Sequence, residues 1–105
     1  MKRSNGLLMF GFWEGMPYGS RTDHYEDFMA YKNTIDKSCV IEHVESLDDA
    51  LATVMSTDIF TGEKFRAGIY EDGVFVFPVD FLRYYKTRDI GIPYEYEAYL
   101  KTILK

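Results

Sequence analysis

The first apolar run of the chain, from Leu7 to Trp13, is continuous rather than alternating. A strand that is apolar on both faces is buried on both sides, so this run predicts a central strand of a sheet. Between Tyr25 and Ile35 the apolar residues change to helical spacing. Asp23 and Glu26 are spaced as a capping pair at the start of this segment. We therefore expect a helix from about residue 22 to residue 37.

The next two segments predict a strand and a second helix. Residues 38–44 contain the adjacent β-branched residues Val40 and Ile41, which favour a strand. From Ser46 to Met55 the apolar residues return to helical spacing. Asp49 follows Ser46 by three residues, which is typical of a helix start.

The clearest local signal lies in residues 65–77. Apolar and polar residues alternate before Asp72-Gly73, and an apolar run follows this pair. Such a pair supplies the positive φ angles of a two-residue hairpin turn. These residues therefore predict two antiparallel strands joined by a tight turn.

Two final helices are predicted over residues 79–88 and from Pro93 to Leu104, separated by Gly91. The complete order is then β-α-β-α-β-β-α-α. The β-α-β unit pairs its strands in parallel and the hairpin pairs its strands antiparallel. We therefore expect an α+β fold with a four-stranded mixed sheet flanked by helices. A length of 105 residues is typical of one domain, so residues 1–105 are expected to form a single globular domain.

Composition limits the classes of partner. Twelve Lys and Arg against seventeen Asp and Glu give a formal charge of −5. Direct nucleic-acid binding needs a positive surface and is not expected. No stretch approaches the roughly 20 apolar residues of a membrane span, so no membrane partner is expected. The single cysteine, Cys39, cannot form an internal disulfide. We expect it to be a small buried side chain in a cytoplasmic protein.

The acidic residues are unevenly distributed. No Lys or Arg lies between Lys37 and Lys64, whereas this segment has six acidic residues. A charge run is most often a solvated face, and the alternative is a docking patch for a protein with a basic surface. The residues expected to contribute to such a patch are Glu45, Asp48 and Asp49, with Tyr94 as an aromatic contact.

The loop over residues 15–22 is a candidate anion site. Free backbone N–H groups, hydroxyls and a guanidinium there could hold a phosphate or a carboxylate. The pattern differs from a phosphate-loop signature, and the structural alternative is a turn that leads into a helix cap. The candidate residues are Gly15, Gly19, Ser20, Arg21 and Thr22, with His24 as an acid or base.

Metal and nucleophile signals are weak. Cys39 and His43 would share one face of a helix, but on the predicted strand they lie about 13 Å apart, too far for one metal ion. No nucleophile motif is present. We therefore expect no metal, no cofactor and no catalytic residue.

These patterns favour a small acidic protein-binding module without catalysis, of the inhibitor, immunity or regulatory type. The alternative is an enzyme that binds a small anion or a phosphate ligand through residues 15–22. A homodimer joined through the hairpin edge or the last helix is a third possibility.

Overall fold

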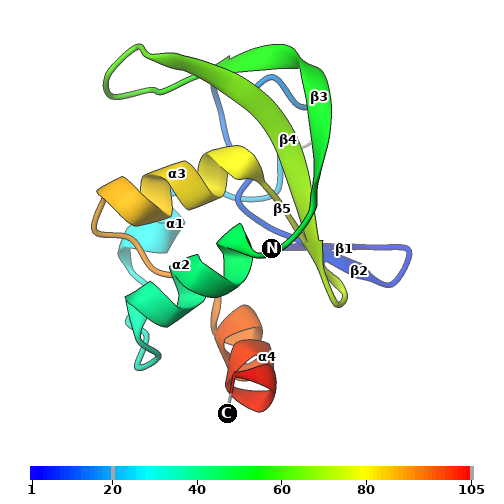
Figure 1. Ribbon diagram of the computed structural model, residues 1–105, viewed down its shortest axis with the longest axis vertical. Helices are drawn as coiled ribbons and strands as arrows, with labels where there is room; N and C mark the ends of the chain where they lie inside the picture. The colour runs from blue at the N-terminus through cyan, green and yellow to red at the C-terminus, as the bar shows by residue number, and fades with distance from the viewer. Residues whose placement is uncertain (20, 105) are drawn as a thin grey trace.

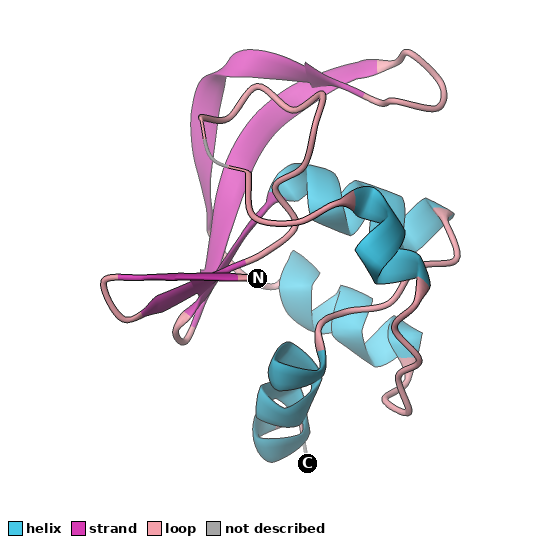
Figure 2. Cartoon of the chain, turned by 180° about the vertical axis from the view of Figure 1, so that it is seen from behind, coloured by secondary structure: helices cyan, strands magenta, loops and turns pink. Residues whose placement is uncertain are grey.

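A five-stranded mixed sheet forms one side of the molecule, and the four helices lie together on the other (Figure 1, Figure 2). The computed structural model describes residues 1–19 and 21–104, without the side chains of residues 49–53. The order across the sheet is β1-β2-β5-β4-β3. β2 and β5 run parallel, and the other neighbouring strands run antiparallel. The strands are β1 (Lys2–Ser4), β2 (Leu7–Met9), β3 (Asp49–Thr57), β4 (Lys64–Asp72) and β5 (Phe75–Pro78).

The helices come in two pairs along the chain, one before β3 and one after β5. The expected α+β class, with a mixed sheet and helices in one domain, is confirmed. The sheet has five strands rather than four, and the order of elements is β-β-α-α-β-β-β-α-α. Across the described residues, none of the helices combines the length and the apolar character needed to pass through a membrane. The helices are α1 (Tyr25–Met29), α2 (Lys37–Glu45), α3 (Val79–Thr87) and α4 (Tyr94–Ile103).

The additional strand belongs to an N-terminal hairpin. Asn5 and Gly6 both have positive φ angles, 50° and 80°, and connect β1 to β2 as a two-residue turn. Asn-Gly is a strong hairpin signal that the sequence analysis did not use. The predicted strand from Leu7 to Trp13 ends early, at Met9, where β2 leaves the ladder that it shares with β5.

The helix predicted over residues 22–37 is much shorter in the structure, where α1 ends at Met29. One reason that the helix does not extend to residue 37 is a tertiary contact from α4. The carboxylate of Glu97 accepts hydrogen bonds from the backbone N–H groups of Thr34 (2.7 Å) and Ile35 (3.0 Å). These N–H groups are therefore unavailable for a continued helix.

The predictions for the next two segments were wrong. Residues predicted as a strand form α2, in which Val40 and Val44 are both buried and Asp36 accepts a capping hydrogen bond from the Ser38 N–H. Two buried valines four residues apart fit one face of a helix as well as a strand. The segment predicted as a helix forms β3, whose pairing with β4 runs from Asp49↔Tyr70 to Thr57↔Lys64.

The elements predicted for the last third of the chain are confirmed, with small shifts at their ends. β4 and β5 form the expected hairpin, although Asp72 pairs with Phe75, so the turn residues are Gly73 and Val74. Gly73 has a φ of 62°, a backbone angle that residues other than glycine rarely adopt. α3 and α4 follow as expected, and Pro93 is the residue that precedes α4 rather than its first residue.

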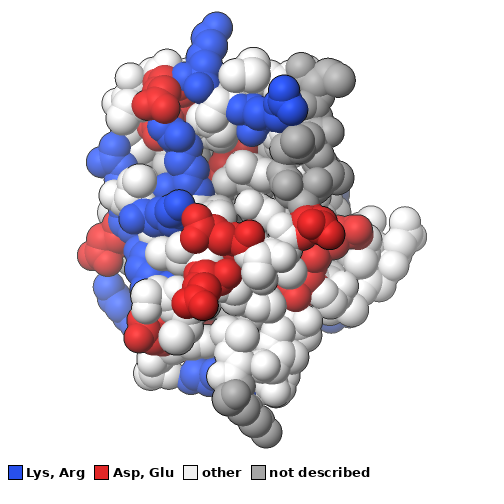
Figure 3. All heavy atoms as spheres, viewed as in Figure 1, with Lys and Arg blue, Asp and Glu red and all other residues white. Residues whose placement is uncertain are grey.

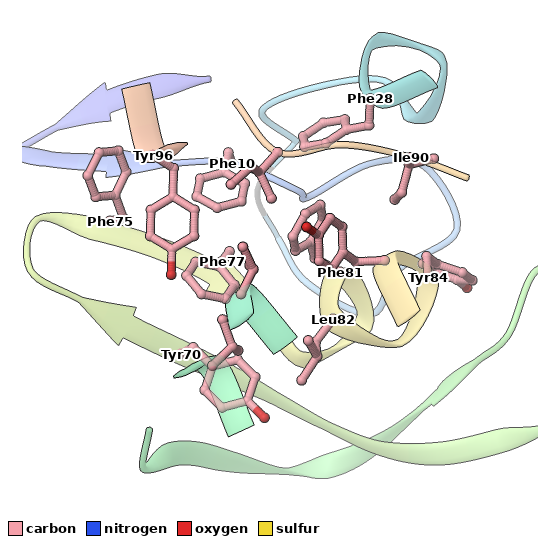
Figure 4. Packing of buried hydrophobic residues seen from close by; sticks show 14 of the residues in the cluster. Phe10, Phe28, Tyr70, Phe75, Phe77, Phe81, Leu82, Tyr84, Ile90 and Tyr96 are labelled. Carbon is pink, nitrogen blue, oxygen red and sulfur yellow. The ribbon is translucent and has the colours of Figure 1, made fainter. Parts of the chain in front are cut away.

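Aromatic rings fill the space between the sheet and the helices (Figure 4). Phe10 lies at the centre of this core, with its ring centroid 4.9 Å from that of Phe77 and 5.3 Å from those of Phe81 and Tyr96. All four side chains are almost completely buried. The core therefore joins β5 to α3 and α4 through the segment that follows β2.

Asp80 at the start of α3 is a buried carboxylate that joins distant segments. It accepts hydrogen bonds from the hydroxyls of Tyr18 (2.8 Å) and Ser56. The Tyr18 hydroxyl also accepts a hydrogen bond from the Gly68 N–H at 3.0 Å. A buried polar group without a partner is costly, so this network ties the 15–22 loop, β3 and β4 to α3.

Replacement of Asp80 by alanine tests this network. We expect Asp80→Ala to lower the free energy of unfolding by about 2–4 kcal/mol, because the buried Ser56 hydroxyl loses its acceptor and the Tyr18 hydroxyl keeps only the Gly68 carbonyl. Urea denaturation followed by circular dichroism measures the change. Asp89→Ala is the control, since exposed substitutions alter stability by only about 0.5 kcal/mol. Equal stabilities of the two variants would contradict the assignment.

Candidate functional site

The turn between β3 and β4 is organised by Asp58, a buried residue directly after β3. Its Oδ1 atom accepts hydrogen bonds from the backbone N–H groups of Phe60 (2.8 Å) and Thr61 (3.0 Å). This is the Asx-turn geometry that aspartate favours. The turn holds Ile59 and Phe60 at the surface, where 47 % and 45 % of these residues are exposed.

Arg83 on α3 completes the environment of this carboxylate. Its Nε atom donates to Asp58 Oδ2 at 2.8 Å, and its Nη2 atom lies 3.4 Å from the carboxylate of Glu63. Burial would raise the pKa of Asp58, but the hydrogen bonds from Arg83 and the turn amides outweigh burial and hold the pKa below its usual value. Asp58 is therefore charged at neutral pH, and its hydrogen bonds stabilise the turn.

The turn forms one wall of a cleft of about 380 Å³, which we call the aromatic cleft. The ring centroid of Tyr25 lies 5.4 Å from those of both Trp13 and Phe60, in edge-to-face geometry. Exposed polar side chains share the cleft with these rings and with Ile59. The residues that line the aromatic cleft are Trp13, Glu14, His24, Tyr25, Glu26, Ile59 and Phe60.

Trp13 has an unusual environment within this cleft. Only 2 % of the residue is exposed, and its indole N–H is buried without a hydrogen-bond acceptor among the described residues. Arg88 is similar, because its Nε atom also lacks a partner there, while its guanidinium carbon lies 3.9 Å from the ring centroid of Phe60. Unsatisfied buried donors are rare in folded proteins, and each one requires a structural or functional explanation.

The predicted anion loop makes contacts within the chain. Arg21 donates from Nη1 to the carbonyl of Tyr18 (2.5 Å) and from Nη2 to that of Met16 (3.2 Å). The hydroxyl of Thr22 donates to Asp23 at 2.7 Å. The guanidinium is therefore engaged by its own loop, and the anion site stays a prediction.

The other residues of that prediction are dispersed. Gly15 has a φ of 91° and Gly19 is exposed. Ser20 lies outside the described residues. His24 precedes α1 and lines the aromatic cleft together with the tyrosine that follows it.

The residues of the predicted acidic patch lie on different elements. Glu45 ends α2, and its carboxylate lies 2.7 Å from the Lys86 ammonium. Asp48 is exposed between α2 and β3, and Asp49 begins β3, although its side chain is not among those described. Tyr94 is 50 % exposed at the start of α4 and accepts a hydrogen bond from the Lys32 backbone N–H (3.1 Å).

Figure 3 shows acidic side chains over α2 and basic side chains along the neighbouring edge, over α3. The Glu45–Lys86 ion pair joins the two groups. The acidic run of the sequence is therefore not one uniform face. Part of its charge is paired at the surface, and Asp58 is buried.

The expectation that Cys39 is buried in a strand was wrong, because it is exposed on α2. It lines an open groove with His43, one helical turn later. The Nε2 atom of His43 lies 2.8 Å from Asp72, which also accepts hydrogen bonds from the hydroxyls of Tyr96 and Tyr99. Among the side chains that the structure describes, no cluster of three or more His, Cys, Asp or Glu has the arrangement of a metal site.

No protein-family model matches the chain, and comparisons with curated proteins and with solved structures found no match either. The candidate site therefore depends on the geometry of this chain. The sequence analysis did not identify Glu14, Tyr25, Ile59 or Phe60 as site residues. An available signal was the pair of large apolar residues directly after Asp58, because turns usually carry polar or small residues.

The role of Asp58 predicts a particular pH dependence of stability. We expect Asp58→Asn to lower the free energy of unfolding by about 2 kcal/mol at neutral pH, because a hydrogen bond between charged groups is lost. The folded-state pKa of Asp58 lies below the unfolded value. The difference between wild type and variant should therefore be constant above about pH 5 and shrink below about pH 4.

Urea denaturation at a series of pH values measures this difference. Glu63→Gln, at an exposed position of the same turn, is the matched control and should show little change. A difference between wild type and Asp58→Asn that does not vary with pH would contradict the proposed charge state.

Proposed function

We propose that this domain is a small protein-binding module without catalysis, whose aromatic cleft holds a basic and partly apolar segment of a protein partner. The observation that supports this proposal is the position of two exposed apolar side chains, Ile59 and Phe60, in the same cleft as the exposed carboxylates of Glu14 and Glu26. Apolar side chains bind apolar groups, and carboxylates select cations. A cytoplasmic location remains part of the proposal.

The β3–β4 turn, which forms one wall of the cleft, is preorganised for binding. The Asp58 hydrogen bond holds the backbone of Phe60, so little backbone conformational entropy is lost when a partner binds to the turn. Covering the exposed half of a phenylalanine contributes about 1 kcal/mol. The cleft would therefore act as one anchoring point within a larger interface rather than as the whole of it.

The charges indicate where a partner's cation would lie. The Arg88 guanidinium already occupies a position over the Phe60 ring. A second cation is therefore expected beside Tyr25, between Glu14 and Glu26, where ring and carboxylates both attract it. The negative charge of the whole chain would increase the rate of encounter with a basic protein.

The predicted acidic patch of Glu45, Asp48 and Asp49, at and after the end of α2, remains a second docking surface in this proposal. Asp48 is exposed, whereas Glu45 is already paired with Lys86. The alternative hypothesis of an anion-binding enzyme is not supported by the contacts that Arg21 makes with its own loop. A homodimer through the hairpin edge or the last helix remains a separate expectation.

Trp13 is the only tryptophan of the chain and lines the cleft, so its fluorescence reports on this site. We expect a peptide with two arginines and a leucine to change the fluorescence in a saturable manner. Phe60→Ala should weaken binding about tenfold, which corresponds to about 1.4 kcal/mol. Reversal of charge in Glu14→Lys/Glu26→Lys should weaken it further, with the largest effect at low salt.

Two controls make this experiment specific. Val74→Ala removes an equally exposed apolar side chain from the β4–β5 turn and should leave binding unchanged. Glu45→Lys/Asp48→Lys reverses charge on the α2 side instead. If this variant weakens binding and the cleft variants do not, the partner binds at α2 and the cleft assignment is wrong.

A further inference from the structure

A groove of about 380 Å³ separates β4 from α3 and is distinct from the aromatic cleft. We propose that this groove, the α3–β4 groove, is a second binding site that takes an acidic segment with an apolar side chain from a protein partner. This inference goes beyond the proposed function and does not depend on it. The groove is lined by Phe65, Val79 and Leu82 together with Arg66, Arg83 and Lys86, and by Thr87 at its end.

The apolar residues give the groove a site for an anchoring side chain. Leu82 is buried, and Phe65 and Val79 are half-buried on the two elements that form the walls. The volume lies within the range of about 300–1,000 Å³ that is typical of ligand pockets. An apolar side chain placed there would leave water and contact three apolar residues.

Three cations surround these apolar residues, and each can still bind an anion of a partner. The exposed Arg66 side chain makes no hydrogen bond or ion pair with the described residues. Lys86 is paired with Glu45, but both side chains are exposed, and pairs of this kind contribute little. Exchange of Glu45 for a partner's carboxylate would therefore cost little.

Arg83 makes more contacts than the other two cations. Its Nε atom is bound to Asp58, and its guanidinium carbon lies 4.6 Å from the ring centroid of Phe65. Glu63 lies 3.4 Å from Nη2 and is largely exposed. A guanidinium has five N–H donors, so the terminal nitrogens can bind a partner's carboxylate while Nε holds Asp58.

The charge around the groove selects a protein segment rather than a nucleic acid. The acidic side chains over α2 lie beside the basic side chains over α3 on this face (Figure 3). A nucleic-acid backbone has a long row of phosphates and would meet these carboxylates. A short acidic segment with one apolar side chain can bind through the three cations and the apolar residues of the groove alone.

The experiment uses the full chain and a fluorescein-labelled peptide with four glutamates around a central leucine. We expect saturable binding by fluorescence anisotropy. Arg66→Glu/Lys86→Glu should weaken it by about tenfold or more, because it replaces two attractive charges with repulsive ones. A peptide with serine in place of leucine should also bind more weakly. Circular dichroism verifies that each variant is folded.

Lys2→Glu/Lys32→Glu is the matched control, because both lysines are exposed and lie outside the groove. It changes the net charge by the same amount and should leave the affinity within about twofold. Equal weakening by both double variants, or the absence of saturable binding, would overturn the proposal. Stronger competition by a single-stranded oligonucleotide than by unlabelled peptide would also overturn it, in favour of a nucleic-acid site.

Discussion

The ion pair between Asp58 and Arg83 is the interaction on which both candidate binding surfaces depend. One oxygen of Asp58 holds the turn that presents Phe60 in the aromatic cleft, and the other binds Arg83. The Arg83 guanidinium in turn lies over Phe65 in the α3–β4 groove. Because the two residues are 25 positions apart, the pair forms only when α3 packs against the β3–β4 hairpin. Folding and the geometry of both surfaces are therefore linked.

Buried carboxylates have a general role in this fold. Asp72, Asp80 and Glu97 each accept hydrogen bonds from residues that are distant in the sequence. A buried carboxylate requires several donors, because burial without them would cost far more than the fold can supply. These groups are used to hold elements together. The acidic composition is therefore a poor guide to the surface, since several acidic residues are internal contacts.

The candidate site was only partly accessible from the sequence. Glu14 and Glu26 were visible as acidic residues, but nothing local placed them in one cleft with Ile59 and Phe60. The predicted anion residues were chosen from one loop, and the contacts of Arg21 show that a loop can satisfy its own guanidinium. Residues from separate elements meet only after packing, so a search along the chain finds sites within loops more readily than sites between elements.

The sequence by itself determined the elements with strong local signals. These are the β4–β5 hairpin, α3 and α4, where hydrophobic periodicity is supported by glycine or proline within one residue of the observed turn or helix start. Tertiary structure decided the middle of the chain. The segment that forms α2 was predicted as a strand, and the segment that forms β3 was predicted as a helix. Short apolar segments fit both the helical and the strand period, and pairing with β4 selects the strand for β3. The carboxylate of Glu97 takes the N–H groups that a longer first helix would need. Local preferences are small, and such long-range contacts outweigh them.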